Sequence, residues 1–327
     1  MTSHQVPNRM VNPSLLKKGF ISGVHKGWSG FFWVLKILVP ISFLTATLEW
    51  SGLLHRMDYF IQPVMNWLHL PAMAALPLLI GIIAGIYGGI ASMAMLPFSR
   101  EQMTLMAIFM LIAHNLIQEG IIQGKSGLHP LKATFSRLAA ATLTILLVAP
   151  FLTSGSVASA SEGIPIRLSP SFISMLKSWS LSTLFLMTKI FIIMMAILIL
   201  LDVLKALGWI EPFVELFAPL LRFLGLSKRV GILWIAGAIF GLAYGAVVII
   251  GEAKEGRLSK EELEGLHLSI GINHSIIEDP LFFLAMGLNA FWLWVPRLIM
   301  AILVVRLFSL WQRGARRRDS NKIPEKV

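Results

Sequence analysis

The chain of 327 residues is too apolar for a soluble domain: 56% of its residues are hydrophobic and 14% are charged, whereas a soluble domain carries about 25% charged residues. It has no cysteine, which excludes disulfides, thiolate metal sites and cysteine nucleophiles. The net charge of +11 does not indicate nucleic-acid binding, because the basic residues lie at the ends of apolar segments and in short loops.

Several apolar segments are long enough to cross a bilayer, which takes about 20 residues. The segment 183–201 contains a single charged residue. Inside a membrane the backbone must satisfy its own hydrogen bonds, so only helices or closed barrels can span. The segments lack the alternation of a barrel and are rich in Leu, Ile, Met and Ala. The predicted fold class is therefore an all-α integral membrane protein.

In chain order, the polar and basic segment 1–27 does not resemble a signal peptide, and two sets of five elements follow it. Each set has a long apolar helix, an amphipathic stretch, a Gly-rich apolar segment, a helix with a His/acid motif and a closing apolar helix. The two sets are expected at 28–49, 53–70, 72–97, 103–123 and 131–153, then at 178–206, 209–226, 230–251, 265–288 and 290–312.

The two sets are copies of one unit. With an offset of 156 residues, Gly52 is equivalent to Gly208, Pro63 to Pro219, Gly81 to Gly237 and Gly85 to Gly241. The motif LIAHNLIQEG (111–120) resembles GINHSIIEDP (271–280) at an offset of 160, so about four residues are inserted in the polar stretch 252–264. The predicted organisation is a cytoplasmic N-terminal segment, a first membrane repeat, an external linker, a second membrane repeat and a basic cytoplasmic tail, at 1–27, 28–153, 154–177, 178–312 and 313–327.

The basic residues favour one topology. If each Gly-rich segment crossed the membrane, each copy would have four spans, and the turn that carries Lys125, Lys132 and Arg137 would face outward, against the positive-inside rule. If each Gly-rich segment instead enters and leaves on one side, each copy has about three spans plus an interfacial amphipathic helix, and the two repeats are inverted. This arrangement places the turn 124–137 and both termini in the cytoplasm, and we expect a bacterial or archaeal inner membrane.

The Gly-rich segments are predicted to be re-entrant or broken helices. Glycine permits a turn at membrane depth, where irregular backbone is tolerated only if it is buried or lines a cavity. The alternative is close helix packing, since the spacing of Gly81 from Gly85 and of Gly237 from Gly241 also fits small-xxx-small contacts. The positions expected to break the backbone are Gly85, Gly88, Gly89, Gly241 and Gly245.

The motif helices carry polar residues near mid-membrane, where a charged side chain costs about 2.5–3.5 kcal/mol. In each copy these residues form one polar stripe along the helix, and inversion would bring the two stripes together, as in the midplane sites of transporters. The expected substrate or ion site is His114, Asn115, Gln118, Glu119, Asn273, His274, Ser275, Glu278 and Asp279.

Two His and three carboxylates suit a divalent metal or a proton relay. The candidate metal ligands are His114, Glu119, His274 and Glu278, with Lys36 and Lys189 as counter-ions. The alternative is that these side chains only pair with one another between helices.

The doubled Gly-rich segment (GIIAGIYGG, GAIFGLAYG) and the motif after it (AHNLIQE, NHSIIED) resemble the nucleoside recognition, or Gate, family. That family includes spore maturation proteins, the gate region of the ferrous iron transporter B and segments of concentrative nucleoside transporters. The resemblance covers about residues 30–310 and implies a transport-type domain with re-entrant or broken helices. This chain departs from the iron transporter in having neither cysteine nor a GxxxxGK[ST] motif.

These observations predict a secondary transporter or permease, not an enzyme, that moves a small polar or charged solute, a cation, metal or nucleoside-like molecule, through a midplane site. Its partners would be the lipid bilayer and the solute, without nucleic acid, and a homo-oligomer is left open. No cofactor is assigned beyond a divalent metal ion. Two alternatives stay open: a membrane-embedded metal-dependent enzyme acting on a lipid, and an accessory membrane protein without transport.

Overall fold

The computed structural model describes residues 13–56, 58–153, 171–209, 228–255 and 258–320, and within these ranges the chain is helical, without strands. Among the described residues, five helical segments are long and apolar enough to cross a membrane: Pro13–Trp50, Arg100–Lys125, Pro130–Leu152, Phe172–Ala206 and Ala290–Gln312. The predicted all-helical membrane fold is confirmed at this level. Five of the six expected spans are thus long and apolar enough to cross, and the sixth, around 265–288, is less apolar.

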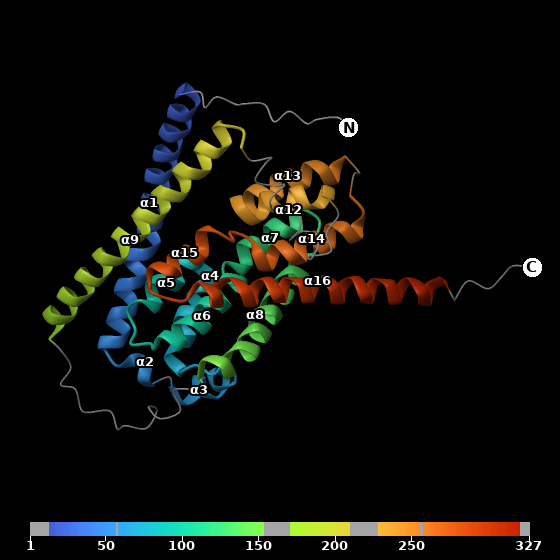
Figure 1. Cartoon of the computed structure of the whole chain (residues 1–327). Coiled ribbons are helices and arrows are strands. Elements are labelled where there is room, and N and C mark those ends of the chain that lie inside the picture. Colours follow the sequence, from blue (N-terminus) through green and yellow to red (C-terminus); the bar gives the residue numbers. More distant parts are fainter. Residues whose placement is uncertain (1–12, 57, 154–170, 210–227, 256–257, 321–327) are drawn as a thin grey trace, which may run out of the picture.

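The two longest helices form an antiparallel pair beside the rest of the molecule (Figure 1). α1 (Pro13–Trp50) begins fifteen residues before the predicted start at 28, and α9 (Phe172–Ala206) begins before the predicted 178. The backbones are in close contact because glycines line α1: a Cβ atom added to Gly23 would lie 2.5 Å from the Cα of Ile199. At the other end of the pair Trp50 packs on Phe172.

The first amphipathic stretch, expected at 53–70, forms the short helices α2 (Leu53–Arg56) and α3 (Asp58–Trp67). The turn η1 (Ala72–Ala74) follows and leads into the Gly-rich segment. The second amphipathic stretch and the linker fall largely on 210–227 and 154–170, outside the described residues.

Each Gly-rich segment is two helices joined by one glycine. α4 (Ala75–Ala84) meets α5 (Ile86–Met93) at Gly85, and α12 (Lys228–Phe240) meets α13 (Leu242–Lys254) at Gly241. These glycines have φ of 88° and 85°, a region that L-residues with a side chain avoid.

At both glycines the chain folds back on itself. A Cβ atom added to Gly89 would lie 3.2 Å from the Cα of Gly81, and one added to Gly245 would lie 2.5 Å from the Cα of Gly237. Along a continuous helix residues eight apart would be about 12 Å apart, so each segment is a helical hairpin. The prediction of a break at Gly88, Gly89 and Gly245 is wrong, because these three lie inside helices. The small-xxx-small alternative thus applies to the contacts within each hairpin, while Gly85 and Gly241 form its turns.

The His/acid helices are also broken, which corrects the expectation of one continuous stripe in each copy. α6 (Arg100–Ala113) ends at His114, Asn115 has φ 49°, and α7 (Leu116–Lys125) follows. α14 (Lys260–Asn273) ends at His274, Ser275 has φ 46°, and α15 (Glu278–Ala285) follows. Each repeat closes with a long helix, α8 (Pro130–Thr153) or α16 (Ala290–Ser320).

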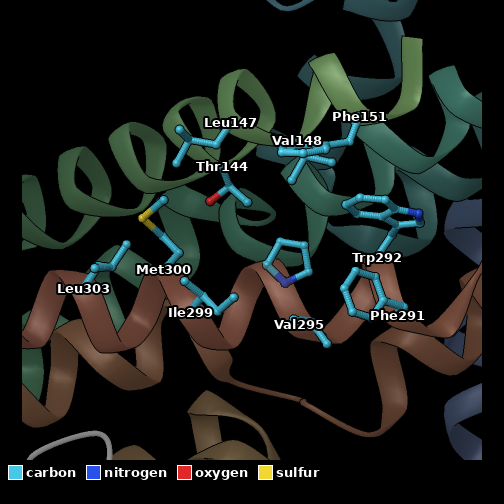
Figure 2. A pocket seen from close by; sticks show the side chains of 11 residues that line it. Thr144, Leu147, Val148, Phe151, Phe291, Trp292, Val295, Ile299, Met300 and Leu303 are labelled. Atoms are coloured by element: carbon cyan, nitrogen blue, oxygen red, sulfur yellow. The ribbon is translucent and has the colours of Figure 1, made fainter. Parts of the chain in front are cut away.

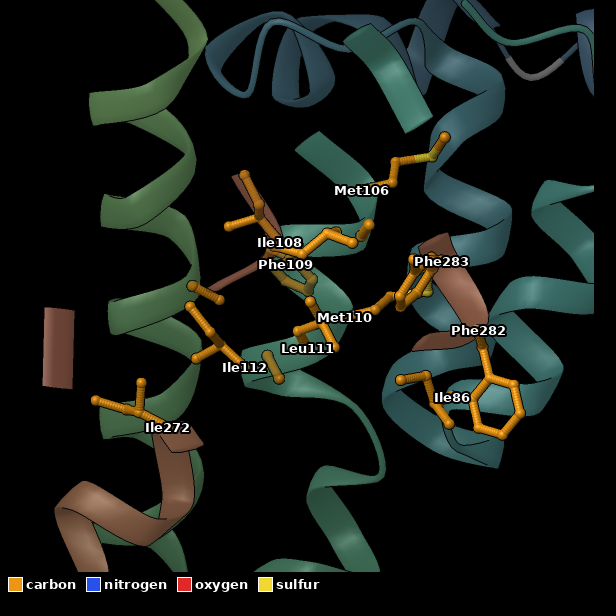
Figure 3. Packing of buried hydrophobic residues seen from close by; sticks show 14 of the residues in the cluster. Ile86, Met106, Ile108, Phe109, Met110, Leu111, Ile112, Ile272, Phe282 and Phe283 are labelled. Atoms are coloured by element: carbon orange, nitrogen blue, oxygen red, sulfur yellow. The ribbon is translucent and has the colours of Figure 1, made fainter. Parts of the chain in front are cut away.

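The core is built around α6, where every residue from Thr104 to Ala113 is buried. A helix that is apolar on all sides belongs at the centre of a bundle. Phe282 and Phe283 of α15, Ile86 of α5 and Ile272 of α14 lie around it (Figure 3). The first helix break therefore directly follows the most buried of the described long helices.

Candidate functional site

Each hairpin turn packs on the break of the His/acid span that follows it. The amide of Asn115 donates to the carbonyl of Gly81 at 2.8 Å, and the amide of Ile276 donates to the carbonyl of Ala238 at 2.8 Å. A Cβ atom added to Gly85 would lie 3.8 Å from the side chain of Asn115. These contacts satisfy amides that the broken helices would otherwise leave free, so hairpin and break support one another in both copies.

Two buried arginines hold the ends of the broken helices, and the sequence interpretation missed both. Arg137 of α8 donates from Nε to the Ile112 carbonyl and from Nη2 to the His114 carbonyl, each at 2.8 Å. Arg297 of α16 makes the same two bonds to Ile272 and His274. A guanidinium suits the last carbonyls of a helix, which are unpaired and carry the negative end of the dipole.

The charge argument placed Arg137 in a cytoplasmic turn at 124–137. The structure instead places it inside α8, where its side chain is 1% exposed, as is that of Arg297. A signal for both exists in the sequence. Each arginine follows its motif histidine by 23 residues, so the pair obeys the offset of 160 that relates His114 to His274.

The two histidines face each other across the repeats. Their Nε2 atoms lie 3.2 Å apart, and the ring centroids 4.8 Å apart. The Nδ1 atom of His114 lies 2.7 Å from the Met110 carbonyl oxygen, and that of His274 lies 3.1 Å from the Gly271 carbonyl oxygen. Both rings are therefore oriented by their own helices, with Nε2 directed at the partner ring.

Glu119, the acid of the first motif, forms an ion pair with Arg137. Glu119 lies 2.5 Å from Nη1 of Arg137, and its two oxygens are 3.4 Å from Nε2 of His114 and 3.2 Å from Nε2 of His274. The carboxylate thus closes one side of the histidine pair while an ion pair fixes its position.

The acids of the second motif are arranged differently. Asp279 Oδ2 lies 3.7 Å from Nε2 of His114 and has no hydrogen-bond partner among the residues that the structure describes, and the same is true of Nη1 of Arg297. Glu278 accepts a hydrogen bond from the hydroxyl of Tyr87 at 2.8 Å. Asn273 is fully buried, with both amide atoms unpartnered in the described part of the chain. The two motifs are equivalent in backbone but not in charge pairing.

A cavity of about 420 Å³ opens beside the histidine pair. It lies between the first hairpin, the breaks of both motif spans and α1, and polar and apolar groups share its wall. Its lining comprises Trp33, Ile37, Ile83, Ala84, Gly85, Ile86, Tyr87, His114, Asn115, Gln118, Ser275, Glu278 and Asp279. Most of the predicted site residues line it, while Glu119, Asn273 and His274 are not part of the wall.

A second cavity, of about 360 Å³, differs in character (Figure 2). It lies between α8 and α16, and apart from Thr144 its walls are apolar, with Phe151 and Trp292 at one end. The hydroxyl of Thr144 donates to the Ala140 carbonyl of its own helix. This groove offers no group for polar recognition.

The predicted counter-ions do not reach the acids in the described structure. Lys189 donates to the Ala285 carbonyl at 2.7 Å, near the end of α15, and lies over the ring of Phe185. Lys36 is exposed on α1 and makes no salt bridge within the described ranges. Arg137 takes the role of counter-ion to Glu119 instead.

Comparisons with known proteins relate the chain to membrane proteins. Residues 31–160 match the family model described as nucleoside recognition, Gate. This part of the chain is therefore similar to Gate domains. The chain is also similar to the uncharacterized membrane protein YvoD of Bacillus subtilis, with 25% identity over 302 residues that cover 91% of this chain and 96% of that protein. No solved structure matches the chain significantly.

The matched region contains the first hairpin turn, the first broken span and the first arginine, because Gly85, His114 and Arg137 all lie within it. Their equivalents Gly241, His274 and Arg297 lie beyond its end. The resemblance noted from the motifs is thus confirmed over residues 31–160, and in the second half of the chain it rests on the internal repeat.

Proposed function

We propose that this Gate-domain membrane protein is a permease or secondary transporter that moves a small polar or charged solute through the cavity at the broken spans. The observation that carries the proposal is the cavity itself, because it joins helix ends and ionisable side chains from both repeats. Discontinuous helices that meet between two repeats form the solute site in many secondary transporters.

The packing supports two inverted repeats. α1 lies antiparallel to its equivalent α9, since Gly19 is close to Val203 while Trp50 packs on Phe172. α8 lies antiparallel to its equivalent α16, since Phe151 packs on Trp292 while Lys132 lies over the ring of Phe308. Equivalent helices that run in opposite directions fit a pseudo-two-fold axis in the membrane plane, and rocking of one repeat against the other would expose the cavity to alternate sides.

Topology is tested by labelling single cysteines, which is direct because the chain has no native thiol. Arg100→Cys and His129→Cys lie at exposed positions on the two sides of the span α6–α7. In whole cells an impermeant maleimide should label position 100 and spare position 129 until the membrane is opened. The opposite pattern would support four spans in each repeat and contradict the inverted arrangement.

The cavity wall suits a solute with polar groups. Imidazole and carboxylate can bind a cation or exchange a proton, while Asn115 and Gln118 offer amide groups that could bind a nucleoside-like solute. A charged side chain inside a membrane helix is costly unless it is paired or serves a function, and Asp279 in the wall has no hydrogen-bond partner among the described residues. We therefore expect flux to depend on the polar residues of the wall and not on the apolar groove between α8 and α16.

Transport is tested in liposomes that contain the purified protein, by measuring uptake of divalent metals, protons and nucleosides. A matched pair of variants each loses one hydroxyl. Tyr87→Phe leaves Glu278 without its donor and should lower flux about 10-fold, since a hydrogen bond to a charged group contributes about 1.5–3 kcal/mol. Thr144→Val lies in the apolar groove and should leave flux unchanged. A folded protein that moves none of these solutes would contradict the proposal.

A further inference from the structure

In their neutral forms the two histidines present lone pairs to the space between the rings. A carbonyl oxygen can only accept a hydrogen bond, and such an oxygen lies 2.7 Å from Nδ1 of His114 and 3.1 Å from Nδ1 of His274. Each Nδ1 therefore carries the proton, and in the neutral rings each Nε2 carries a lone pair. Two such atoms 3.2 Å apart repel one another unless a positive species lies between them.

The surroundings add further acceptors and leave a negative charge. Glu119 and Asp279 place carboxylate oxygens within 3.7 Å of the His114 Nε2 atom, and Asp279 Oδ2 is buried without a hydrogen-bond partner in the described ranges. Three carboxylates, including Glu278, are gathered with two guanidiniums, Arg137 and Arg297. With neutral histidines this group has one excess negative charge, which favours a bound cation.

The spacing of the two nitrogens fits a transition metal. Zinc binds imidazole nitrogen at about 2.0–2.1 Å with tetrahedral angles, which separates two such ligands by about 3.3 Å, close to the 3.2 Å observed. The ligand atoms of His114, His274 and Asp279 all lie within 4.8 Å of one another. Asp279 must turn slightly toward the pair to complete the set.

We propose that His114, His274 and Asp279 bind one divalent first-row transition-metal ion, with the fourth position open to the cavity. Glu119 is not a ligand, because Arg137 holds it, and it instead balances charge beside the ion. Imidazole selects such metals over Ca²⁺ and Mg²⁺, which prefer oxygen ligands. The inference deepens the proposed function, on which the role of the metal as transported solute rests.

The binding site is tested with cobalt as a spectroscopic probe. The full chain is purified with a tag that contains no histidine and is titrated with Co²⁺ in detergent. The wild type should bind one Co²⁺ with the intense visible absorption of a tetrahedral ion, and one equivalent of Zn²⁺ should bleach it. A wild type that shows only the weak spectrum of octahedral Co²⁺, or no saturable binding, overturns the proposal without any variant.

Variants then assign the ligands. His274→Gln and Asp279→Asn preserve size and should each weaken Co²⁺ binding more than about 100-fold, because loss of even an outer partner of a metal ligand costs about 10–100-fold. His129→Gln removes an exposed imidazole and should bind as the wild type does. Unchanged affinity in both site variants, with elution as folded protein, would refute the assignment.

The metal inference and the transport proposal fail in different ways. Tight tetrahedral binding without metal flux in liposomes would retain the site and reject transport of the ion. Flux of another solute by a protein that binds no Co²⁺ or Zn²⁺ would retain the permease and reject the metal site.

Discussion

The two buried arginines offer a matched comparison within one molecule. Arg137 and Arg297 donate to the same pair of carbonyls in the two repeats, but only Arg137 also forms an ion pair, with Glu119 at 2.5 Å. Replacing each by methionine removes equivalent backbone bonds and keeps an apolar stem of similar length. The difference between Arg137→Met and Arg297→Met therefore isolates the ion pair.

The magnitude follows from what each change leaves unpaired. A buried carbonyl that loses its donor costs about 1–3 kcal/mol, and both variants incur this cost. Removing one partner of a buried ion pair costs about 3–5 kcal/mol. We expect Arg137→Met to be the less stable variant by about 3 kcal/mol, at the low end of that range, because two imidazoles remain within 3.4 Å of Glu119. Adding Glu119→Gln to Arg137→Met should recover most of the difference, since the stranded charge is then gone.

The assay is unfolding in detergent, followed by tryptophan fluorescence and by the fraction of protein that elutes as a monodisperse peak after heating. The four proteins, wild type, Arg137→Met, Arg297→Met and Arg137→Met/Glu119→Gln, form the comparison. Equal stability of the two single variants, or no recovery in the double variant, would show that the ion pair of Glu119 does not stabilise the first repeat and would refute the reasoning.

Two further predictions concern glycines. Gly85→Ala forces a side chain into φ 88° and ψ 178° and should destabilise the protein by about 1–3 kcal/mol. Its control, Gly251→Ala, lies at a helical position with open space around it and should be neutral or stabilising. Equal unfolding midpoints of the two variants would contradict the role of Gly85 in the hairpin turn. Gly23→Ala places a Cβ atom 2.5 Å from the backbone of α9, whereas in Gly30→Ala the nearest atom is a flexible Met sulfur at 3.4 Å. The yield of folded protein should fall for Gly23→Ala and not for Gly30→Ala. Equal yields would show that close contact between α1 and α9 is not needed for folding.

The sequence predicted the parts that depend on composition and on repetition. Apolar length predicts the spans, and the offset of 156 that relates Gly85 to Gly241 predicts two equivalent hairpin turns. The identical motif spacing also predicts that His114 and His274 occupy equivalent places. Apolar length is a local property, and the two repeats show the glycine and histidine positions twice, so both can be recognised in a single sequence.

The breaks of the motif helices could not be predicted in the same way. Neither Pro nor Gly lies between Ala113 and Leu116, and the left-handed residue is Asn115 in one copy and Ser275 in the other. Asn adopts this conformation more readily than most residues, but one Asn in an apolar segment is weak evidence of a break. Here tertiary contacts select it, since the hairpin accepts the Asn115 amide and Arg137 binds the end of α6.

Arg137 was misplaced because the positive-inside rule counts basic residues near the ends of spans without asking whether they face the protein. A basic residue near the start of a helix can lie at the membrane surface or inside the protein. The sequence next to Arg137 does not distinguish these two positions. Only its equivalence to Arg297, 160 residues later, separates it from the exposed Lys125 and the half-buried Lys132, since both arginines then follow a motif histidine at the same distance.

One methylene group distinguishes the two acids that matter most. Glu119 reaches Arg137, whereas the shorter Asp279 leaves its Oδ2 atom and the Nη1 atom of Arg297 unpartnered among the described residues. Asp279→Glu should let the carboxylate reach Arg297 and reproduce the first repeat's ion pair.

The unfolding midpoint should then rise while Co²⁺ binding and flux are lost, whereas Asp279→Asn should lose binding without the gain in stability. If Asp279→Glu bound Co²⁺ as the wild type does, the carboxylate that Asp279 leaves unpaired would not be the feature that allows the two histidines to bind a metal ion.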